Sequence, residues 1–599
     1  MKRIVFIILF VGFQVANAQY KISDGTELLN LQKVPMEKMY VHASSPLLFS
    51  GEYLYYKLYC INAQTNKLSS ISRMAYVSLV NDKGEPVFEH KIRLEKGMGQ
   101  SDHFINTDVP SGNYKLVAYT QWMKNGGLAQ VFKDDIAIVN PYLADQSAIL
   151  RQNAQDKEIS VKSNDRKDPD LKQEERNDLL QLQLDTLTFV TRQKVMLTLR
   201  NYKGNLGHGQ YSIAVKKIEQ LAVRPRMDAE TFTDRYLSVN KRIPQTIGDS
   251  IFLPEQRGEL IFGRVIDDIN NLPAVGKEVI ISVPGQEFLL KLATTDQNGY
   301  FFTYLRKEYK TPLTIFQVLD QGEYSIDIGR QEDLPFDSMK FGNFTIDPSD
   351  AAAIKERSIQ NQIENAYFEV KPDSILQPDP IDPFDGGVPE VFNLDEYTRF
   401  PTLQETLIEI LNTVGYRTGK DGHDYIRVAQ DFEKFNEPYN DYPAIVLIDG
   451  VFIPDHGSIK DFKAEQVKTI KVLRDQLILG AKQYQGIVSI ETVNGDYYDG
   501  FQRNNSIVSD LELPKTEKNY FRQSYSQESD INRRIPDYRR LLLWEPQVDL
   551  SGTEANFEFY TSDITGDFDI YLEGFTTYGK PVSIKKEFVV TKSKTPINN

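Results

Sequence analysis

Residues 112–119 read Gly-Asn-Tyr-Lys-Leu-Val-Ala-Tyr, a glycine turn followed by an aromatic residue that opens a largely apolar strand. The glycine permits a positive φ, and the aromatic ring can close one end of a sandwich core. The same device recurs in Gly209-Gln210-Tyr211, Gly322-Glu323-Tyr324 and Gly566-Asp567-Phe568. Because the spacings are irregular, the pattern predicts several separate β-sandwiches and not one large sheet or a strict repeat.

Alternation of apolar and polar residues extends this prediction along the chain. It is found in 74–80, 195–199, 279–283 and 557–560, and each run is bounded by turn residues, as the strands of sandwiches are. The aromatic composition, with 32 Tyr and 33 Phe against 2 Trp, also favours strands. The sequence therefore predicts a mainly β chain of serial β-sandwich domains, with one α+β exception.

Residues 390–498 form that exception. A helix is expected over 403–411, with Thr402 as its N-cap and Glu405 three residues later. Asp449-Gly450 lies between two apolar runs and predicts a hairpin, because both turn positions tolerate positive φ. The other expected elements are a helix over 459–467, strands over 469–473 and 486–492, and a turn at Gly480.

The first 18 residues predict a secretory signal peptide. Lys2 and Arg3 precede the apolar run 4–15, and Ala16-Asn17-Ala18 is the small-x-small pattern that a signal peptidase requires. A membrane anchor is the alternative, but the run is shorter than the about 20 residues of a spanning helix. No later segment has 18 uninterrupted apolar residues, so we expect no transmembrane segment after cleavage. We expect an exported protein of the periplasm or outer membrane, with the cell surface as an alternative.

Two stretches have the composition of linkers. Half of the positions in 151–180 are charged, with both signs mixed, and residues 371–390 contain five prolines among acids and glycines. The expected domains are a signal peptide over 1–18, a sandwich over 32–140, a charged linker over 141–180, a second sandwich over 181–258, a third over 259–345, a helix and Pro/Asp-rich linker over 346–389, the α+β domain over 390–498 and a C-terminal sandwich over 515–592.

The first sandwich carries a family resemblance. Glu37-Lys38-Met39-Tyr40-Val41-His42, followed by Phe49-Ser50-Gly51-Glu52 and the run 112–120, resembles the opening of macroglobulin-like domains in bacterial envelope proteins. The resemblance implies a β-sandwich over about 32–140. The α2-macroglobulin family traps proteases with a bait region and a Cys-Gly-Glu-Gln thioester. The single cysteine of this chain, Cys60, is followed by Ile61-Asn62-Ala63, so the trapping chemistry is not carried over.

Three further segments resemble modules of composite envelope proteins. Residues 259–328, with Gly263-Arg264-Val265-Ile266-Asp267 and Asp296-Gln297-Asn298-Gly299, look like a carboxypeptidase-regulatory-like module. Residues 390–498 resemble the plug domain of TonB-dependent outer-membrane receptors, through 443–451, 470–473 and 486–490. Residues 515–592 resemble a closing Ig-like domain. A receptor barrel needs about 22 strands of about 10 residues, and only 101 residues follow Tyr498. We therefore expect a plug-like domain without the barrel.

Charge and reactive residues argue against several functions. The net charge of −15 repels phosphate backbones, so nucleic acid is not an expected partner. The six histidines form no His-Glu-x-x-His, and the chain has no Gly-x-Ser-x-Gly elbow and no phosphate-binding glycine loop. Cys60 lies in an alternating run and is expected to be a buried thiol. We expect no enzyme, no catalytic residue, no cofactor and no metal site.

Tyrosine clusters are the expected contact surfaces. A strand alternates its faces, so the four tyrosines in 53–59 cannot all face one core. Exposed tyrosine is a common anchor in protein interfaces, and ordinary strand surface is the alternative reading. The candidate partner-binding residues are Tyr53, Tyr55, Tyr497 and Tyr498.

These inferences predict a non-enzymatic binding or scaffold protein of the cell envelope. Its plug-like domain would dock a protein partner, an outer-membrane β-barrel or a transport or assembly complex. One alternative is a macroglobulin-like relative of protease inhibitors, with 151–180 as the cleavable segment. The other is a secreted surface adhesin or glycan-binding protein.

Overall fold

The structure is a computed structural model, and it describes residues 20–151, 178–237, 245–330, 332–420, 422–430, 442–501, 503–525 and 534–593. The predicted signal peptide over 1–18 and most of the charged linker over 141–180 lie outside these residues. Strands predominate over helices, so the mainly β fold class is confirmed.

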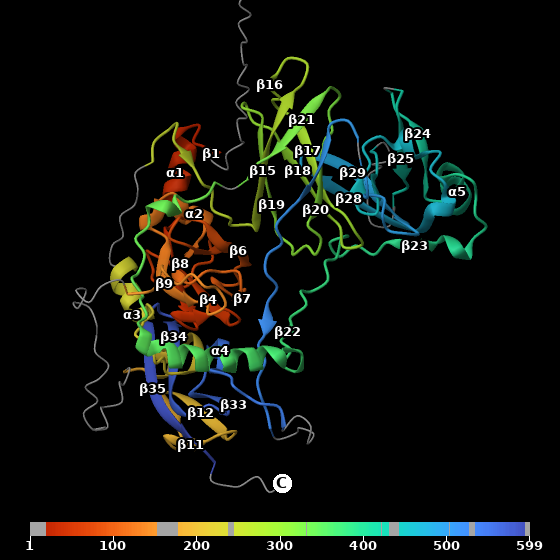
Figure 1. The fold of residues 1–599 in the computed structure, drawn as a ribbon. Helices are drawn as coiled ribbons and strands as arrows, with labels where there is room; N and C mark the ends of the chain where they lie inside the picture. The colour runs from red at the N-terminus through yellow and green to blue at the C-terminus, as the bar shows by residue number, and fades with distance from the viewer. Residues whose placement is uncertain are drawn as a thin grey trace, which may run out of the picture. The chain divides into compact units, whose positions relative to one another are not determined.

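The described chain divides into two compact units, which Figure 1 colours by residue number. The inserted unit consists of Arg257–Glu332 and Pro378–Leu513. The flanking unit consists of Gln19–Gln256, Asp333–Gln377 and Pro514–Asn599. Each unit is described by itself.

The flanking unit begins with a sandwich of two sheets, in the strand orders β2-β4-β7 and β3-β9-β8-β5-β6. The strands are β2 (Glu37–Ala43), β3 (Leu47–Phe49), β4 (Tyr53–Asn62), β5 (Met74–Val80), β6 (Pro86–Arg93), β7 (Met98–Phe104), β8 (Gly112–Tyr119) and β9 (Phe132–Val139). All of them lie within the domain expected over 32–140. Cys60 is fully buried in the core between the sheets, as predicted for a lone thiol.

A second sandwich of the flanking unit is built from two distant parts of the chain. Its strands are β10 (Leu180–Leu184), β11 (Thr188–Val190), β12 (Lys194–Asn201), β13 (Gly209–Lys217), β32 (Leu541–Leu550), β33 (Glu554–Tyr560), β34 (Gly566–Thr576) and β35 (Pro581–Thr591). The sheets have the orders β10-β12-β33 and β11-β35-β34-β13-β32. The expected separate sandwiches over 181–258 and 515–592 are therefore wrong. Each segment supplies only four strands, and these bury their apolar faces against strands of the other segment.

The glycine–aromatic device closes three strands, but Gly112 and Gly209 do not adopt the positive φ that the sequence suggested, which is found at Gly322 and Gly566. The tyrosine hydroxyl donates back to a carbonyl that precedes the glycine, as Tyr114 Oη does to Pro110 O (2.7 Å), Tyr211 Oη to Gly207 O (2.9 Å) and Tyr324 Oη to Gln321 O (3.0 Å). This is the geometry of a tyrosine corner. A Cβ added at Gly209 would lie 2.6 Å from Tyr211 Oη, so the ring can fold back only over a glycine.

The flanking unit also contains short elements outside the sheets of its two sandwiches. These are β1 (Tyr20–Lys21), α1 (Gly25–Lys33), α2 (Gln121–Lys124), α3 (Ala229–Phe232), β14 (Ser250–Ile251), α4 (Ala351–Ala366), β22 (Ser374–Ile375) and β31 (Lys518–Asn519). Figure 1 shows α4 lying across the junction of the two sandwiches. Within the described ranges, none of the helices combines the length and the apolar character needed to cross a bilayer.

The inserted unit contains a third sandwich. One sheet has the order β16-β15-β19 with β21 also paired to β15, and the other has the order β18-β17-β20-β30. The strands are β15 (Glu259–Asp267), β16 (Leu272–Pro273), β17 (Glu278–Val283), β18 (Leu289–Thr294), β19 (Tyr300–Leu305), β20 (Leu313–Val318), β21 (Tyr324–Ile328) and β30 (Ser506–Asp510). The expected boundary of 259–345 needs correction at its C-terminal end. The edge strand β30 comes from beyond residue 498, and residues 333–345 belong to the flanking unit.

The α+β domain follows the sandwich in the chain. Its elements are β23 (Glu390–Asn393), α5 (Leu403–Ile410), β24 (Val414–Thr418), β25 (Asp424–Val428), β26 (Ile445–Ile448), β27 (Val451–Phe452), β28 (Val467–Leu479) and β29 (Lys482–Thr492), with the sheet order β23-β28-β29-β26-β27. Thr402 caps α5 by accepting from Glu405 N at 3.3 Å. Positive φ angles of 48° at Asp449 and 84° at Gly450 form the predicted hairpin turn.

Two expectations for this part of the chain are wrong. The helix over 459–467 is replaced by two short 3₁₀ turns, His456–Ile459 and Ala464–Gln466, because Val467 already belongs to β28. The segment 371–390 is not a free spacer, since Ile381 and Phe384 are each only 8% exposed. Ile381 joins the core of the third sandwich, which gives this Pro-rich segment an anchor on the inserted unit.

Candidate functional site

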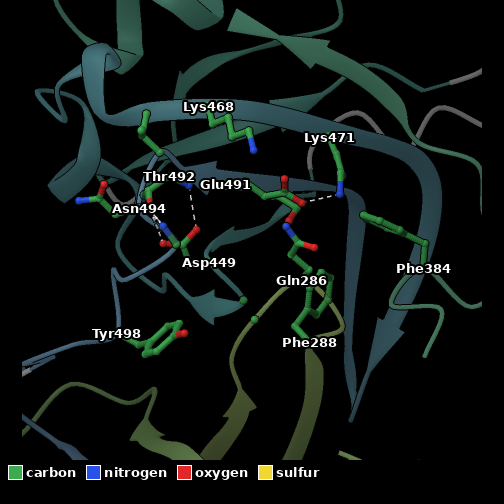
Figure 2. A pocket seen from close by; sticks show the side chains of 15 residues that line it. Gln286, Phe288, Phe384, Asp449, Lys468, Lys471, Glu491, Thr492, Asn494 and Tyr498 are labelled. Carbon is green, nitrogen blue, oxygen red and sulfur yellow. Dashed lines mark hydrogen bonds and ion pairs between the residues drawn. The ribbon is translucent and has the colours of Figure 1, made fainter. Parts of the chain in front are cut away.

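A pocket of about 350 Å³ lies in the inserted unit where the α+β sheet meets the third sandwich (Figure 2). The side chains that define it come from both modules. The loop before β18 supplies Gln286 and Phe288, β28 supplies Lys468 and Lys471, and the loop after β29 supplies Asn494 and Tyr498.

Asp449, in the turn between β26 and β27, holds the pocket together. Its Oδ1 accepts from Thr492 N (2.8 Å), and its Oδ2 accepts from Thr492 Oγ1 (2.6 Å) and Tyr497 N (3.0 Å). The backbone oxygen of Asp449 accepts from Gly285 N of the sandwich at 2.8 Å. Asp449 thus positions three parts of the pocket: the end of β29, the loop that carries Tyr498, and the sandwich loop at Gly285.

The pocket combines polar side chains with an aromatic floor. Lys468 is exposed and its side chain points into the pocket in Figure 2, whereas Lys471 is paired with Glu491. The rings of Phe288 and Phe384 meet edge to face, with centroids 5.8 Å apart. Burial, and then the neighbouring Asp499 carboxylate, raises the pKa of Tyr498, so its hydroxyl is neutral and can donate. This arrangement suits hydrogen bonding and ion pairing with a polar ligand.

The two candidate tyrosines of this unit have different surroundings. Tyr498 lines the pocket. The ring of Tyr497 packs against Phe462 and Phe501, at centroid distances of 6.1 and 6.2 Å, and its hydroxyl accepts from Arg503 Nη2 at 3.0 Å. Tyr497 therefore supports the loop, and Tyr498 presents its side chain to the pocket.

Tyr53 and Tyr55 lie together in the flanking unit, on β4. Their rings are stacked with centroids 5.7 Å apart, and both line a second cavity. Tyr53 also stacks on Phe368, and Tyr55 meets Tyr520 edge to face. All four candidate tyrosines are partly buried, so none is a freely projecting surface anchor.

Three histidines, His42, His90 and His103, lie in the first sandwich, whereas His423 and His456 belong to the α+β domain. His42 is fully buried, and its Nδ1 lies 2.6 Å from Ser212 Oγ. The rings of His90 and His103 lie 5.3 Å apart, and Tyr56 Oη is 2.7 Å from His90 Nδ1. Burial, with Lys515 nearby, lowers the pKa of His90 to about 3 and that of His103 to about 4. Within the described residues, no group of three or more His, Cys, Asp or Glu side chains is arranged to hold a metal ion.

Sequence reasoning missed the charged residues of the second cavity. Lys216 and Glu219 follow the apolar part of β13, and Arg357 lies in the middle of α4. Arg357 is only 7% exposed, although the helix around it is mostly polar. The available signal was weak: Lys216-Lys217 ends an apolar strand, which is equally typical of a solvated strand end.

No protein-family model matches this chain, and no curated protein matches it either. Among solved structures, it is similar to the native Escherichia coli alpha-2-macroglobulin, with 8% identity, 94% of this chain and 40% of that protein covered, and a TM-score of 0.23. A Salmonella alpha-2-macroglobulin mutant has 8% identity, coverages of 98% and 40%, and a TM-score of 0.23. A tandem-repeat region of a large adhesion protein has 9% identity, coverages of 94% and 100%, and a TM-score of 0.13.

The chain thus spans about two fifths of the length of the bacterial macroglobulins that it matches. Similarities of this size show neither a family nor a function. The carboxypeptidase-regulatory-like and plug-like resemblances stay predictions from the sequence.

Proposed function

We propose that this chain is an exported, non-enzymatic binding protein of the bacterial cell envelope. Its inserted unit docks a protein partner, which we take to be an outer-membrane β-barrel or a transport or assembly complex. The signal peptide and the plug-like resemblance motivate this proposal, since a plug domain ordinarily has a barrel wall as its neighbour.

The observation that supports it is the construction of the pocket in the inserted unit. The α+β domain is joined to the sandwich by the Asp449–Gly285 hydrogen bond and by β30, which returns to pair with β20. The two modules thus present one pocket with the exposed ammonium of Lys468, the amides of Gln286 and Asn494, and the Tyr498 hydroxyl. A preformed site with a few convergent polar groups suits recognition of a protein loop.

Photo-crosslinking in intact cells tests this proposal. Benzoylphenylalanine replaces Tyr498 in one variant and Tyr202 in the control, because Tyr202 is 55% exposed and belongs to the flanking unit. We expect an adduct with an envelope protein from position 498 that the control does not form. The adduct should weaken when Lys468→Glu is added, since this change reverses the charge that faces the pocket. Adducts of equal yield from both positions, or none from position 498, would refute docking at this site.

The alternatives are separated by two further measurements. A macroglobulin-like inhibitor would be cleaved within 151–180 and would retain the attacking protease. The deciding part of that segment, 152–177, lies outside the described residues. A surface adhesin would be removed from whole cells by external protease, whereas a periplasmic protein would be protected until the outer membrane is opened.

A further inference from the structure

The second cavity belongs to the flanking unit and has a volume of about 220 Å³. Its walls come from β4, β13, α4 and β32, with residues 371–373 and 520–521 alongside. Both sandwiches and the helix that lies across them therefore contribute side chains. The site is separate from the pocket of the inserted unit, and nothing in the proposed function depends on it.

One wall of the cavity is aromatic. Tyr55 lies at its centre, with centroid distances of 5.1 Å to Tyr520, 6.1 Å to the Trp544 ring and 5.7 Å to Tyr53. Tyr53 stacks in turn on Phe368 at 5.8 Å, with the two ring planes 12° apart. Phe368 is 46% exposed, so it forms the rim. Such a wall accepts the apolar or planar body of a small ligand.

The cavity is also lined by charged side chains, and most of these are paired. Arg357 makes a bidentate pair with Glu52, at 2.8 Å from Nε and 2.7 Å from Nη2, and its Nη1 also contacts Glu219. Lys371 Nζ lies 2.5 Å from Glu364 Oε2. These three carboxylates are thus compensated by cations within the protein.

Lys216 is the exception. Within the described part of the chain its ammonium has no ion pair and no hydrogen bond, and it lies over the ring of Tyr571 at 5.4 Å from the centroid. The guanidinium of Arg540 also lines the cavity, and its one ion-pair partner among the described residues is Glu219, at 3.9 Å.

The charges around Lys216 do not neutralise it. Arg226 and Arg357 face it as cations, and Asp569 and Glu219 face it as anions. Asp569 is already engaged, because it pairs with Lys585 at 3.1 Å and accepts from Tyr571 Oη at 2.8 Å. Burial, and then Arg226, lowers the pKa of Lys216 to about 7. Lys216 is therefore only partly protonated near pH 7, and an anion bound beside it would favour its charged form.

We propose that this cavity binds a small monocarboxylate with an apolar or aromatic body, and that the carboxylate pairs with Lys216 while the body lies on the Tyr55–Phe368 wall. A single negative charge matches the single ammonium that Lys216 carries when it is protonated. A phosphate dianion would bring a second negative charge close to Glu52, Glu219 and Glu364, which line the same cavity. Two buried donors of the aromatic wall, Tyr520 Oη and Trp544 Nε1, have no hydrogen-bond partner among the described residues, and a carboxylate oxygen is an acceptor that either could use.

The carboxylate could belong to a free organic acid or to the C-terminus of a polypeptide. The test therefore uses two probe pairs on the full chain: 3-phenylpropanoate with its neutral amide, and the peptide Ala-Ala-Ala-Phe with its C-terminal amide. Binding is measured by calorimetry. The ionisation of Lys216 is followed by carbon NMR of the reductively dimethylated protein, in which a bound carboxylate raises the pKa of that one lysine.

We expect an acid probe to bind at least tenfold more tightly than its amide and to raise the pKa of Lys216. Lys216→Met, which keeps the side-chain length without the charge, should abolish this preference. Lys203→Met should retain it, because Lys203 is exposed and lies outside the cavity lining. Phe368→Ala at the rim should weaken the binding of both the acid and the amide. The thermal midpoint of each variant confirms that it is folded.

Binding of 3-phenylpropanoate alone assigns a free acid as the ligand source, and tighter binding of the peptide assigns a polypeptide C-terminus. The proposal is overturned if neither acid is preferred over its amide, or if the preference survives in Lys216→Met. It is also overturned if Lys216 titrates like an exposed lysine in the unliganded protein.

Discussion

Arg226 and Glu573 lie 347 residues apart in the chain, and Arg226 Nη2 donates to Glu573 Oε1 at 2.9 Å in the interior of the flanking unit. Glu573 is fully buried on β34. It also accepts from Tyr40 Oη on β2 (3.0 Å), from Ala229 N (2.9 Å) and from Ser583 Oγ (2.8 Å). One carboxylate thus joins both sandwiches to the segment that connects them. Burial raises its pKa, and the Arg226 charge opposes that shift.

Glu573→Ala should destabilise the flanking unit by about 3–5 kcal/mol, because it leaves the Arg226 guanidinium buried without a counter-charge. Urea unfolding followed by tryptophan fluorescence measures this loss. Glu554→Ala serves as the control, since Glu554 and Arg200 are 3.8 Å apart and half exposed, and such a pair contributes about 0–1 kcal/mol. Equal losses in the two variants would show that Glu573 does not join the sandwiches.

In the tyrosine corner at Gly209 and Tyr211, we expect two small substitutions to lower the free energy of unfolding by different amounts. Tyr211→Phe removes only the bond to Gly207 O and should cost about 0.5–1.5 kcal/mol. Gly209→Ala should cost more, because its Cβ would lie 2.4 Å from Phe575 O and 2.6 Å from Tyr211 Oη. Gly552→Ala is the matched control, since the nearest atom to its Cβ is 4.0 Å away. Thermal unfolding ranks the three variants, and a mild Gly209→Ala would contradict the steric argument.

We expect the flanking unit to lose stability in mild acid, because burial lowers the pKa values of His90 and His103. Their pKa values of about 3 and 4 in the folded chain lie below the ordinary value of 6.5, so the unfolded chain binds protons first as the pH falls. Stability is fully present above pH 6.5 and decreases toward pH 4, by at most about 1.4 kcal/mol per pH unit for each histidine.

Unfolding free energies between pH 7 and pH 4.5 check this expectation. His103→Gln should flatten the decline relative to the parent chain. His208→Gln should leave the decline as it is, because His208 lies in the second sandwich and away from this pair. A parallel decline in all three proteins would assign the acid sensitivity to other groups.

Asp449→Asn should loosen the pocket of the inserted unit while keeping the turn, since asparagine also tolerates positive φ. An amide nitrogen in place of Oδ2 can only donate, so the bond accepted from Tyr497 N is lost, at about 1.5–3 kcal/mol. Hydrogen exchange of residues 493–498 should accelerate by about tenfold or more. Asp455→Asn is the control because Asp455 is exposed and caps a short turn elsewhere. Unchanged exchange at 493–498 would show that Asp449 does not hold this loop.

Several features could be predicted because they depend on residues close together in the chain. The Asp449-Gly450 turn, the Thr402 cap and the glycine–aromatic corners each follow from the chemistry of fewer than ten neighbouring residues. Alternation over 195–199 likewise identified the apolar face of β12, whereas β5 and β17 are buried on both faces. The candidate tyrosines were located by the same reasoning, and three of the four line a pocket.

Tertiary structure alone decided how those pieces combine. Alternation shows that a strand has an apolar face, but it does not show which strand covers that face. The pairing of β13 with β34 and of β20 with β30 was therefore invisible in the sequence, and the domains expected over 181–258, 259–345 and 515–592 needed correction. The Arg226–Glu573 pair and the lowered pKa of Lys216 have the same origin. Whether a charged group is paired depends on neighbours brought close by folding, often from hundreds of residues away.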